Sequence, residues 1–327
     1  MNAALPLLLL LCPPLVSSDQ ESPALRPGDP LPVRFKHVAT IASGSRDEPY
    51  RVDWSPDGKL LAVPDEQGAV RLVDAITQAT KRKLPGHRRL ADVVAFSPDG
   101  RTLATAHGEI KLWSVADGLD HALLRDGLGR VTSLSWSPDG NQLAAGYGDG
   151  SWRIWDVESG KVQHQQQAHS ERVLVGFLPD GRSLVSGGND FKLRLWNAAT
   201  GEQEDPFIGQ ASTAALAISA TGQIATAIGG RRISVRTFGV PASWQVIQTG
   251  AGFPQSVAIS PCEQLVAAGH LNGVVKVWER ETGLPCGEVW AHRASICSLR
   301  FSPEGTTLVT SALDQTTKFW QLELFGR

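Results

Sequence analysis

The chain has 327 residues, 42% of them hydrophobic, with 33 glycines, 10 tryptophans and a single methionine. This composition excludes a disordered chain and favours a large, turn-rich β protein with a well-packed core. Because 31 Lys and Arg are balanced by 33 Asp and Glu, which leaves a net charge of −2, the overall charge gives no support to a nucleic acid or an anionic membrane surface as the partner.

The N-terminal segment differs in composition from the rest of the chain. Residues 1–18 contain a leucine-rich run that is too short to span a bilayer but is similar to the core of a secretory signal peptide, with the small residues Val16 and Ser18 before a cleavage site. No Lys or Arg precedes the run and prolines interrupt it, so a disordered apolar leader and a misassigned start are the alternatives. A signal peptide implies a secreted or periplasmic protein, and the alternatives imply a cytoplasmic one. Residues 19–32 carry four prolines and no periodicity, which predicts a linker.

From residue 33 onward one pattern recurs every 40 to 42 residues. Each unit has an aromatic or aliphatic anchor residue directly before a turn of the type SPDG, in which proline presets φ and glycine accommodates the exit. An apolar residue stands two positions before each anchor, the alternation typical of a strand with one face in the core. The seven anchors are Trp54, Phe96, Trp136, Phe177, Ile218, Ile259 and Phe301.

Each unit continues with a second apolar segment and a third that ends at Trp in most units, followed by a glycine and a less regular outer segment. Four short antiparallel strands in about 41 residues are typical of a β-propeller blade. The sequence therefore predicts one all-β domain over residues 33–327, a seven-bladed β-propeller of four-stranded antiparallel blades.

The two ends of this domain indicate how the ring of blades closes. After Trp320 too few residues remain for an outer strand, whereas residues 33–41 read as a strand without a unit of their own. We therefore predict that this N-terminal strand completes the last blade, which removes exposed sheet edges.

The repeat resembles the WD-repeat family from residue 33 to about residue 321. The resemblance rests on small-residue–His pairs before the first strand, on the turn, and on Trp at the end of the third strand, once followed by Asp. These pairs are Gly86-His87, Ala168-His169, Ala291-His292 and Trp155-Asp156.

In that family a hydrogen-bonded tetrad links a His, a Ser or Thr on the second strand, an Asp in the next turn and the Trp. Two units match it completely, and the resemblance implies a structural role for their side chains, because each buried polar group gains a partner. They are His169, Ser186, Asp190 and Trp196 in the fourth unit, and His292, Thr310, Asp314 and Trp320 in the seventh.

Other units match only in part. The second unit keeps His87, Thr105 and Trp113, whereas the third has Ala145 at the hydroxyl position. Blades with an incomplete tetrad must be held together by packing.

The sequence contains no phosphate-binding loop, metalloprotease motif or nucleophile elbow. His164 and His169 are poorly spaced for chelation across a strand and a loop. Cys286 and Cys297 could lie on neighbouring strands and pair in an oxidising compartment, but buried free thiols are commoner and no disulfide is predicted. We therefore expect no catalytic residue, no cofactor and no metal site.

The loops that lead into the first strand of each unit should gather on one face of the disc. They carry arginines and aromatic residues, which are enriched at binding hot spots. Interleaved acidic residues make an ordinary solvated rim the alternative for these positions. The candidate protein-binding residues are Arg46, Tyr50, Arg88, Arg89, Arg130, Arg172, Phe253 and Arg293.

The family resemblance implies a non-enzymatic scaffold that binds other proteins on a rigid propeller surface and supports assembly of a complex. It implies protein partners, with no nucleic acid, no transmembrane segment and a propeller that is monomeric by itself. An exported propeller enzyme or small-ligand sensor that uses the central channel is the alternative.

Overall fold

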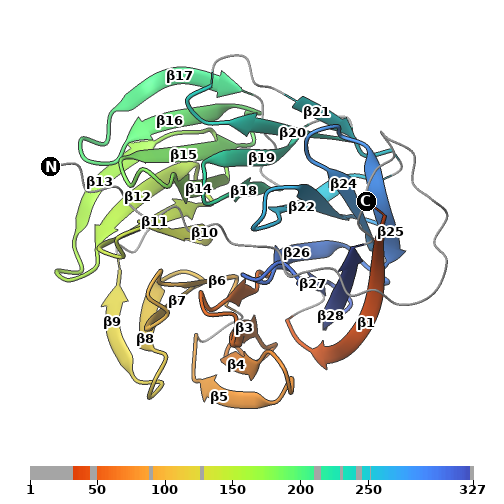
Figure 1. Ribbon diagram of the computed structural model, residues 1–327. Coiled ribbons are helices and arrows are strands. Elements are labelled where there is room, and N and C mark those ends of the chain that lie inside the picture. Colours follow the sequence, from red (N-terminus) through yellow and green to blue (C-terminus); the bar gives the residue numbers. More distant parts are fainter. Residues whose placement is uncertain are drawn as a thin grey trace, which may run out of the picture.

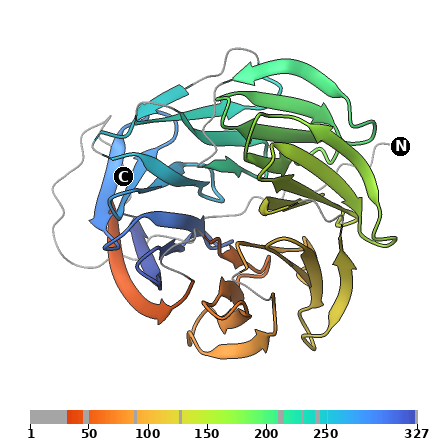
Figure 2. The ribbon, with the colours of Figure 1, turned by 180° about the vertical axis from the view of Figure 1, so that it is seen from behind.

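The computed structural model describes residues 32–44, 50–87, 91–125, 129–209, 215–228, 231–240, 245–250 and 252–324. The candidate signal peptide lies outside these residues, as does all of the predicted linker except its last residue. Within the described residues every regular element is a β-strand, and the strands form seven four-stranded antiparallel sheets. Figure 1 shows these sheets as the blades of a ring, and Figure 2 shows the same ring from behind. The predicted seven-bladed β-propeller is confirmed.

The inner strand of each blade lies nearest the centre of the ring (Figure 1) and ends at the anchor residue predicted from the sequence. Blades are numbered here in the order of these strands. They are β2 (Asp53–Trp54), β6 (Val93–Phe96), β10 (Val131–Trp136), β14 (Val173–Phe177), β18 (Leu216–Ile218), β22 (Pro254–Ile259) and β26 (Ile296–Phe301).

The turn after each inner strand is fixed by local side-chain chemistry, as blade 2 shows. Gly100 has a φ of 70°, a conformation that costs glycine little, and its N–H donates to the carbonyl of Ser97 at 2.9 Å. The Ser97 hydroxyl donates to Asp99 at 2.6 Å. The second strands that follow are β3 (Leu60–Pro64), β7 (Thr102–Ala106), β11 (Gln142–Tyr147), β15 (Ser183–Gly188), β19 (Gln223–Ile228), β23 (Leu265–His270) and β27 (Thr307–Ala312).

The third and outer strands complete each blade. The third strands are β4 (Val70–Asp74), β8 (Ile110–Ser114), β12 (Ser151–Asp156), β16 (Leu193–Asn197), β20 (Arg232–Thr237), β24 (Val274–Glu279) and β28 (Thr316–Leu324). The outer strands are β5 (Thr80–Leu84), β9 (Asp120–Leu124), β13 (Val162–Gln167), β17 (Gln203–Gly209), β21 (Gln245–Gln248), β25 (Pro285–Trp290) and, for blade 7, β1 (Val33–Ala42).

The N-terminal strand closes the ring, as the sequence predicts. β1 pairs antiparallel with β28, from Val33 opposite Leu324 to Ala42 opposite Thr316, and the sheet order is β1-β28-β27-β26. Both ends of the propeller are thereby held in one blade, and β1 covers the edge of β28 that would otherwise be unpaired.

The hydrophobic core is divided among the contacts between neighbouring blades, with one buried cluster for each of the seven contacts. Trp152 of blade 3 is fully buried against Trp196 of blade 4, with ring centroids 5.2 Å apart. Trp54 of blade 1 packs against Phe319 of blade 7 at 6.2 Å across the closure. Because each blade buries its faces only against its neighbours, the ring holds its surface loops on a stiff frame.

Candidate binding face and central channel

Blade 4 contains a continuous polar network between its loop and its third strand. The Trp196 indole Nε1 donates to the Ser186 hydroxyl at 2.8 Å, and that oxygen lies 2.8 Å from His169 Nε2. On the other side of the imidazole, His169 Nδ1 lies 2.7 Å from an oxygen of Asp190. The four side chains identified by the family resemblance therefore lie in one chain of contacts.

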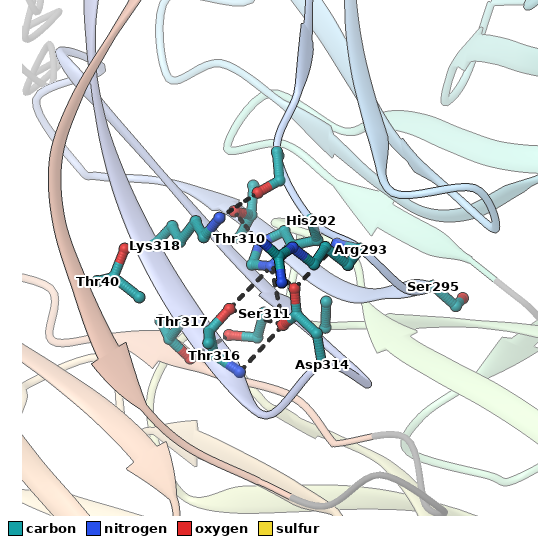
Figure 3. A network of polar contacts seen from close by, with 12 residues as sticks. Thr40, His292, Arg293, Ser295, Thr310, Ser311, Asp314, Thr316, Thr317 and Lys318 are labelled. Carbon is teal, nitrogen blue, oxygen red and sulfur yellow. Dashed lines mark hydrogen bonds and ion pairs between the residues drawn. The ribbon is translucent and has the colours of Figure 1, made fainter.

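Blade 7 repeats this arrangement, and Figure 3 shows His292, Thr310 and Asp314 of its network. Trp320 Nε1 donates to the Thr310 hydroxyl at 3.0 Å, and the same oxygen lies 2.7 Å from His292 Nε2. His292 Nδ1 lies 3.1 Å from Asp314, whose other contacts include the backbone N–H of Arg293 at 3.0 Å. The carboxylate thus ties the loop before β26 to the turn after β27.

The direction of each proton in these networks follows from the groups at the two ends. An indole can only donate and an ionised carboxylate can only accept, so the hydroxyl donates to Nε2 and Nδ1–H donates to Asp. Burial lowers the pKa of both His169 and His292, which keeps the rings neutral. Although burial opposes it, hydrogen bonds from His169 and Arg194 hold the pKa of Asp190 below its ordinary value. In both networks the hydrogen bonds on the two ring nitrogens hold a neutral imidazole in one orientation.

Blade 2 has the same contacts without a hydrogen-bonded acid, since the nearest oxygen of Glu109 lies 4.0 Å from His87 Nδ1. His87 Nε2 lies 2.9 Å from the Thr105 hydroxyl, which accepts from Trp113 Nε1 at 2.8 Å. Burial, together with the charge of Lys111, lowers the pKa of His87 to about 4.

Three of the eight candidate binding residues, Arg46, Arg88 and Arg89, lie outside the described residues. For a fourth candidate, Tyr50, the prediction of a surface position is wrong, because its side chain is fully buried. Its hydroxyl lies 2.9 Å from that of Ser43 and donates to the carbonyl of Ala312 at 3.1 Å, and burial raises its pKa to about 12. The position precedes an inner strand but packs into the contact between blades 7 and 1, where ring closure covers it.

Arg130 and Arg172 lie at the channel on the face where the inner strands begin, named here the N-terminal face. Arg130 Nε donates to Asp92 at 2.6 Å, and Asp92 also lies 3.0 Å from His107 Nδ1. Arg172 Nε is buried without a hydrogen-bond partner. Both side chains line a cavity of about 350 Å³.

The remaining two candidates, Phe253 and Arg293, are exposed on the same face. The guanidinium of Arg231 lies 5.2 Å from the Phe253 ring centroid, and Leu271, 54% exposed, donates its backbone N–H to the Phe253 carbonyl at 3.0 Å. The loop that carries Arg293 is joined to the next turn of blade 6 by a hydrogen bond from the His292 N–H. We name Arg231, Phe253, Leu271 and Arg293 the blade 5–7 patch.

Sequence reasoning missed Arg231 and Leu271, because they lie in turns between second and third strands and only the loops before inner strands were considered. It also missed Arg51 and Arg300, which line the channel. The sequence signal for such residues is the alternation of side chains between the two faces of the inner strand. Arg300 lies between the buried Leu299 and Phe301, so its own side chain points away from the core.

The described residues contain no group of three or more His, Cys, Asp or Glu that could hold a metal ion. Cys262, Cys286 and Cys297 are free thiols, and burial raises the pKa of Cys286 and of Cys297 to about 11. Over the same part of the chain, no helix has the length and apolar character needed to cross a membrane.

Several known proteins are similar to this chain in sequence. It is 23% identical over 285 residues to protein tipD of Dictyostelium discoideum, covering 83% of this chain and 39% of tipD. It is 30% identical over 145 residues to the COMPASS component SWD3 of Saccharomyces cerevisiae, covering 43% of this chain and 45% of SWD3. It is 25% identical over 283 residues to the APC/C activator protein CDC20 of the same yeast, covering 83% of this chain and 41% of that protein. The chain thus spans less than half the length of each of these relatives.

Two family models match the chain. The model described as "WD domain, G-beta repeat" matches residues 78–114, 160–197, 245–279 and 284–321. The model described as "Anaphase-promoting complex subunit 4 WD40 domain" matches residues 125–178. Together with the seven four-stranded blades, these matches establish that the chain belongs to the WD-repeat family.

Proposed function

We propose that this protein is a non-enzymatic WD-repeat scaffold that binds other proteins and supports assembly of a complex. The observation that carries the proposal is the blade 5–7 patch. It combines two exposed apolar side chains, Phe253 and Leu271, with two exposed arginines, and aromatic residues and arginine are enriched at protein interfaces.

The rigidity of the frame supports the same proposal. Phe253 and Leu271 are joined by a backbone hydrogen bond, and the loop before Arg293 is hydrogen-bonded to the adjacent turn of blade 6. Such a preformed surface loses little conformational entropy when a partner binds. We also propose that the two complete networks, around His169 and His292, are structural, since their hydrogen bonds hold the loops in place and leave no group for catalysis.

The names of the relatives agree with a role in assemblies. They include a component of COMPASS and an activator of the APC/C, and one matching family model is named for a subunit of the anaphase-promoting complex. Which complex this chain would join is open, because WD-repeat propellers share a fold and differ in surface.

Affinity purification of the full chain from its native cells, with matched surface variants, tests the proposal. The partner should copurify in stoichiometric amount with the wild type, be lost with Phe253→Glu, and be retained with Arg101→Glu. Arg101 is exposed beside the turn after β6, at the opposite end of the channel from the patch. A chain that purifies alone, or a partner that both variants retain, would contradict the proposed surface.

An exported propeller enzyme or small-ligand sensor is the second candidate. One observation favours its small-ligand form, namely the arginine-lined cavity at the mouth of the channel. The described residues that line this cavity include a single carboxylate, Asp92, and no histidine.

A further inference from the structure

The channel mouth on the N-terminal face brings together charged side chains from four successive blades. Arg51 of blade 1, Asp92 of blade 2, Arg130 of blade 3 and Arg172 of blade 4 line the same cavity of about 350 Å³, and Cys297 of blade 7 also lines it. Arg51 and Arg172 are 121 positions apart, so the ring arrangement of the blades, and no local segment, assembles the site.

The acidic group of the cavity is already engaged. Asp92 lies 2.6 Å from Arg130 Nε and 3.0 Å from His107 Nδ1, and its side chain is almost fully buried. It therefore compensates the charge of Arg130. Within the described part of the chain neither Arg51 nor Arg172 forms an ion pair of its own, although the charge of Asp92 also acts on Arg172.

Arg172 has a hydrogen-bonding group that faces no acceptor. Its Nε is buried without a hydrogen-bond partner, a situation that ordinarily costs about 1 to 3 kcal/mol and more for a charged group. The presence of this unpartnered Arg172 Nε–H in a cavity is explained if it donates a hydrogen bond to an acceptor from outside the chain.

Arg51 and Arg172 also repel each other. Burial, the charge of Arg172 and the charge of Arg300 lower the pKa of Arg51 to about 9, which still leaves its guanidinium protonated at neutral pH. The positive charge is local, because the whole chain carries a net charge of −2. Cys297 adds no negative charge at neutral pH, since burial raises its pKa to about 11.

We infer that this cavity binds an oxyanion, a carboxylate or phosphate group held by Arg51 and Arg172. Guanidinium presents paired N–H donors that match the oxygens of either group, and the bond is strengthened where water is excluded. The inference goes beyond the proposed scaffold function and stands without it, because a free anion needs no protein partner to bind here. The same chemistry has two sources, a small dissolved anion and an acidic side chain of a bound protein.

Isothermal titration calorimetry of the full chain tests the site with citrate and with inorganic phosphate, and in a second arm with a hexaglutamate peptide. The matched variants are Arg51→Gln and Arg172→Gln, with Arg101→Gln as an exposed arginine outside both the cavity and the blade 5–7 patch. We expect Kd to rise at least tenfold in each cavity variant and to stay within twofold in Arg101→Gln.

The two arms identify the source of the anion. Saturable binding of citrate or phosphate that the cavity variants weaken identifies a free small anion. Binding of the peptide alone, with the same dependence on Arg51 and Arg172, identifies an acidic side chain. Absence of binding in both arms at 10 mM, or equal binding by wild type and cavity variants, would overturn the inference.

Folding of the variants is checked by thermal melting without anion. Since Arg172→Gln removes a poorly compensated buried cation, its melting temperature should equal or exceed that of the wild type, and citrate should no longer raise it. Loss of binding with an unchanged fold is then attributable to the site.

Discussion

In blade 3 the buried indole Nε1 of Trp155 has no hydrogen-bond partner, and Ala145 occupies the position that would supply one. Ala145 pairs with Leu134 of the inner strand in the register in which Ser186 pairs with Val175 and Thr310 pairs with Leu299. Blade 3 therefore lacks the hydroxyl that accepts from Trp in blades 2, 4 and 7, and blade 6 lacks it as well, with Ala268 at this register position.

Ala145→Ser should stabilise the protein, because the new hydroxyl can accept from Trp155 Nε1. We expect a gain of about 0.5 to 1.5 kcal/mol in the free energy of unfolding, measured by urea denaturation. Ala144→Ser is the matched control: Ala144 is equally buried but packs among the apolar residues between blades 3 and 4. It should destabilise, and a control that gained as much as Ala145→Ser would contradict the explanation.

Ser186→Ala should have the reverse effect in blade 4. It leaves both Trp196 Nε1 and His169 Nε2 without their shared partner, at a cost of about 1 to 3 kcal/mol. Ser186→Thr keeps the hydroxyl in the form that blade 7 uses at Thr310 and should stay within about 1 kcal/mol of the wild type. The same urea experiment measures both, and equal losses in the two variants would show that the hydrogen bonds are not the cause.

Stability should fall as the pH is lowered from neutral. The pKa of His87 is about 4 in the folded protein, below the ordinary value of about 6.5 in the unfolded chain. The unfolded state therefore binds the proton first, and the contribution of His87 is complete above about pH 6.5 and lost as the pH falls towards 4. His169 and His292, whose pKa values burial also lowers, act in the same direction.

Urea denaturation at pH 7 and pH 5 checks this dependence. The wild type should lose stability by up to about 1.4 kcal/mol per pH unit for each such histidine. His87→Gln should be less stable at pH 7 and lose less between the two pH values, whereas the exposed His121→Gln should follow the wild type. A wild type equally stable at both pH values would exclude this account of the buried histidines.

Deletion of residues 33–41 should destabilise the ring strongly. The segment supplies most of β1, and with it the pairing to β28 that holds the two ends of the propeller together. We expect the melting temperature to fall by at least about 10 °C. A deletion of residues 19–30, within the predicted linker, is the control and should leave it unchanged; if both deletions behave alike, strand closure is not what the segment provides.

The sequence predicts the architecture well because its determinants are local and repeated. The turn after each inner strand is specified by a few adjacent residues such as Ser97, Asp99 and Gly100, and seven copies reinforce one another. The closing strand could be predicted because residues 33–41 have the pattern of a strand and no unit of their own.

The surface could be predicted only in part, because it depends on contacts between distant segments. Tyr50 has the position of a loop residue, yet its hydroxyl reaches Ala312, 262 residues away, and no local pattern reports that contact. Arg51 and Arg172 acquire their significance from each other across the channel. Arg300 was within reach of sequence reasoning, since the residues on either side of it face the core.

The account rests on the blade 5–7 patch as a protein-binding surface. The most direct measurement is the Kd of the purified stoichiometric partner for the wild type, Arg293→Glu and Arg101→Glu, by calorimetry at one fixed ionic strength. We predict at least a tenfold rise in Kd for Arg293→Glu, about 1.4 kcal/mol, and less than a twofold change for Arg101→Glu. Equal Kd values for the three proteins, or a loss confined to Arg101→Glu, would contradict the assignment of this face.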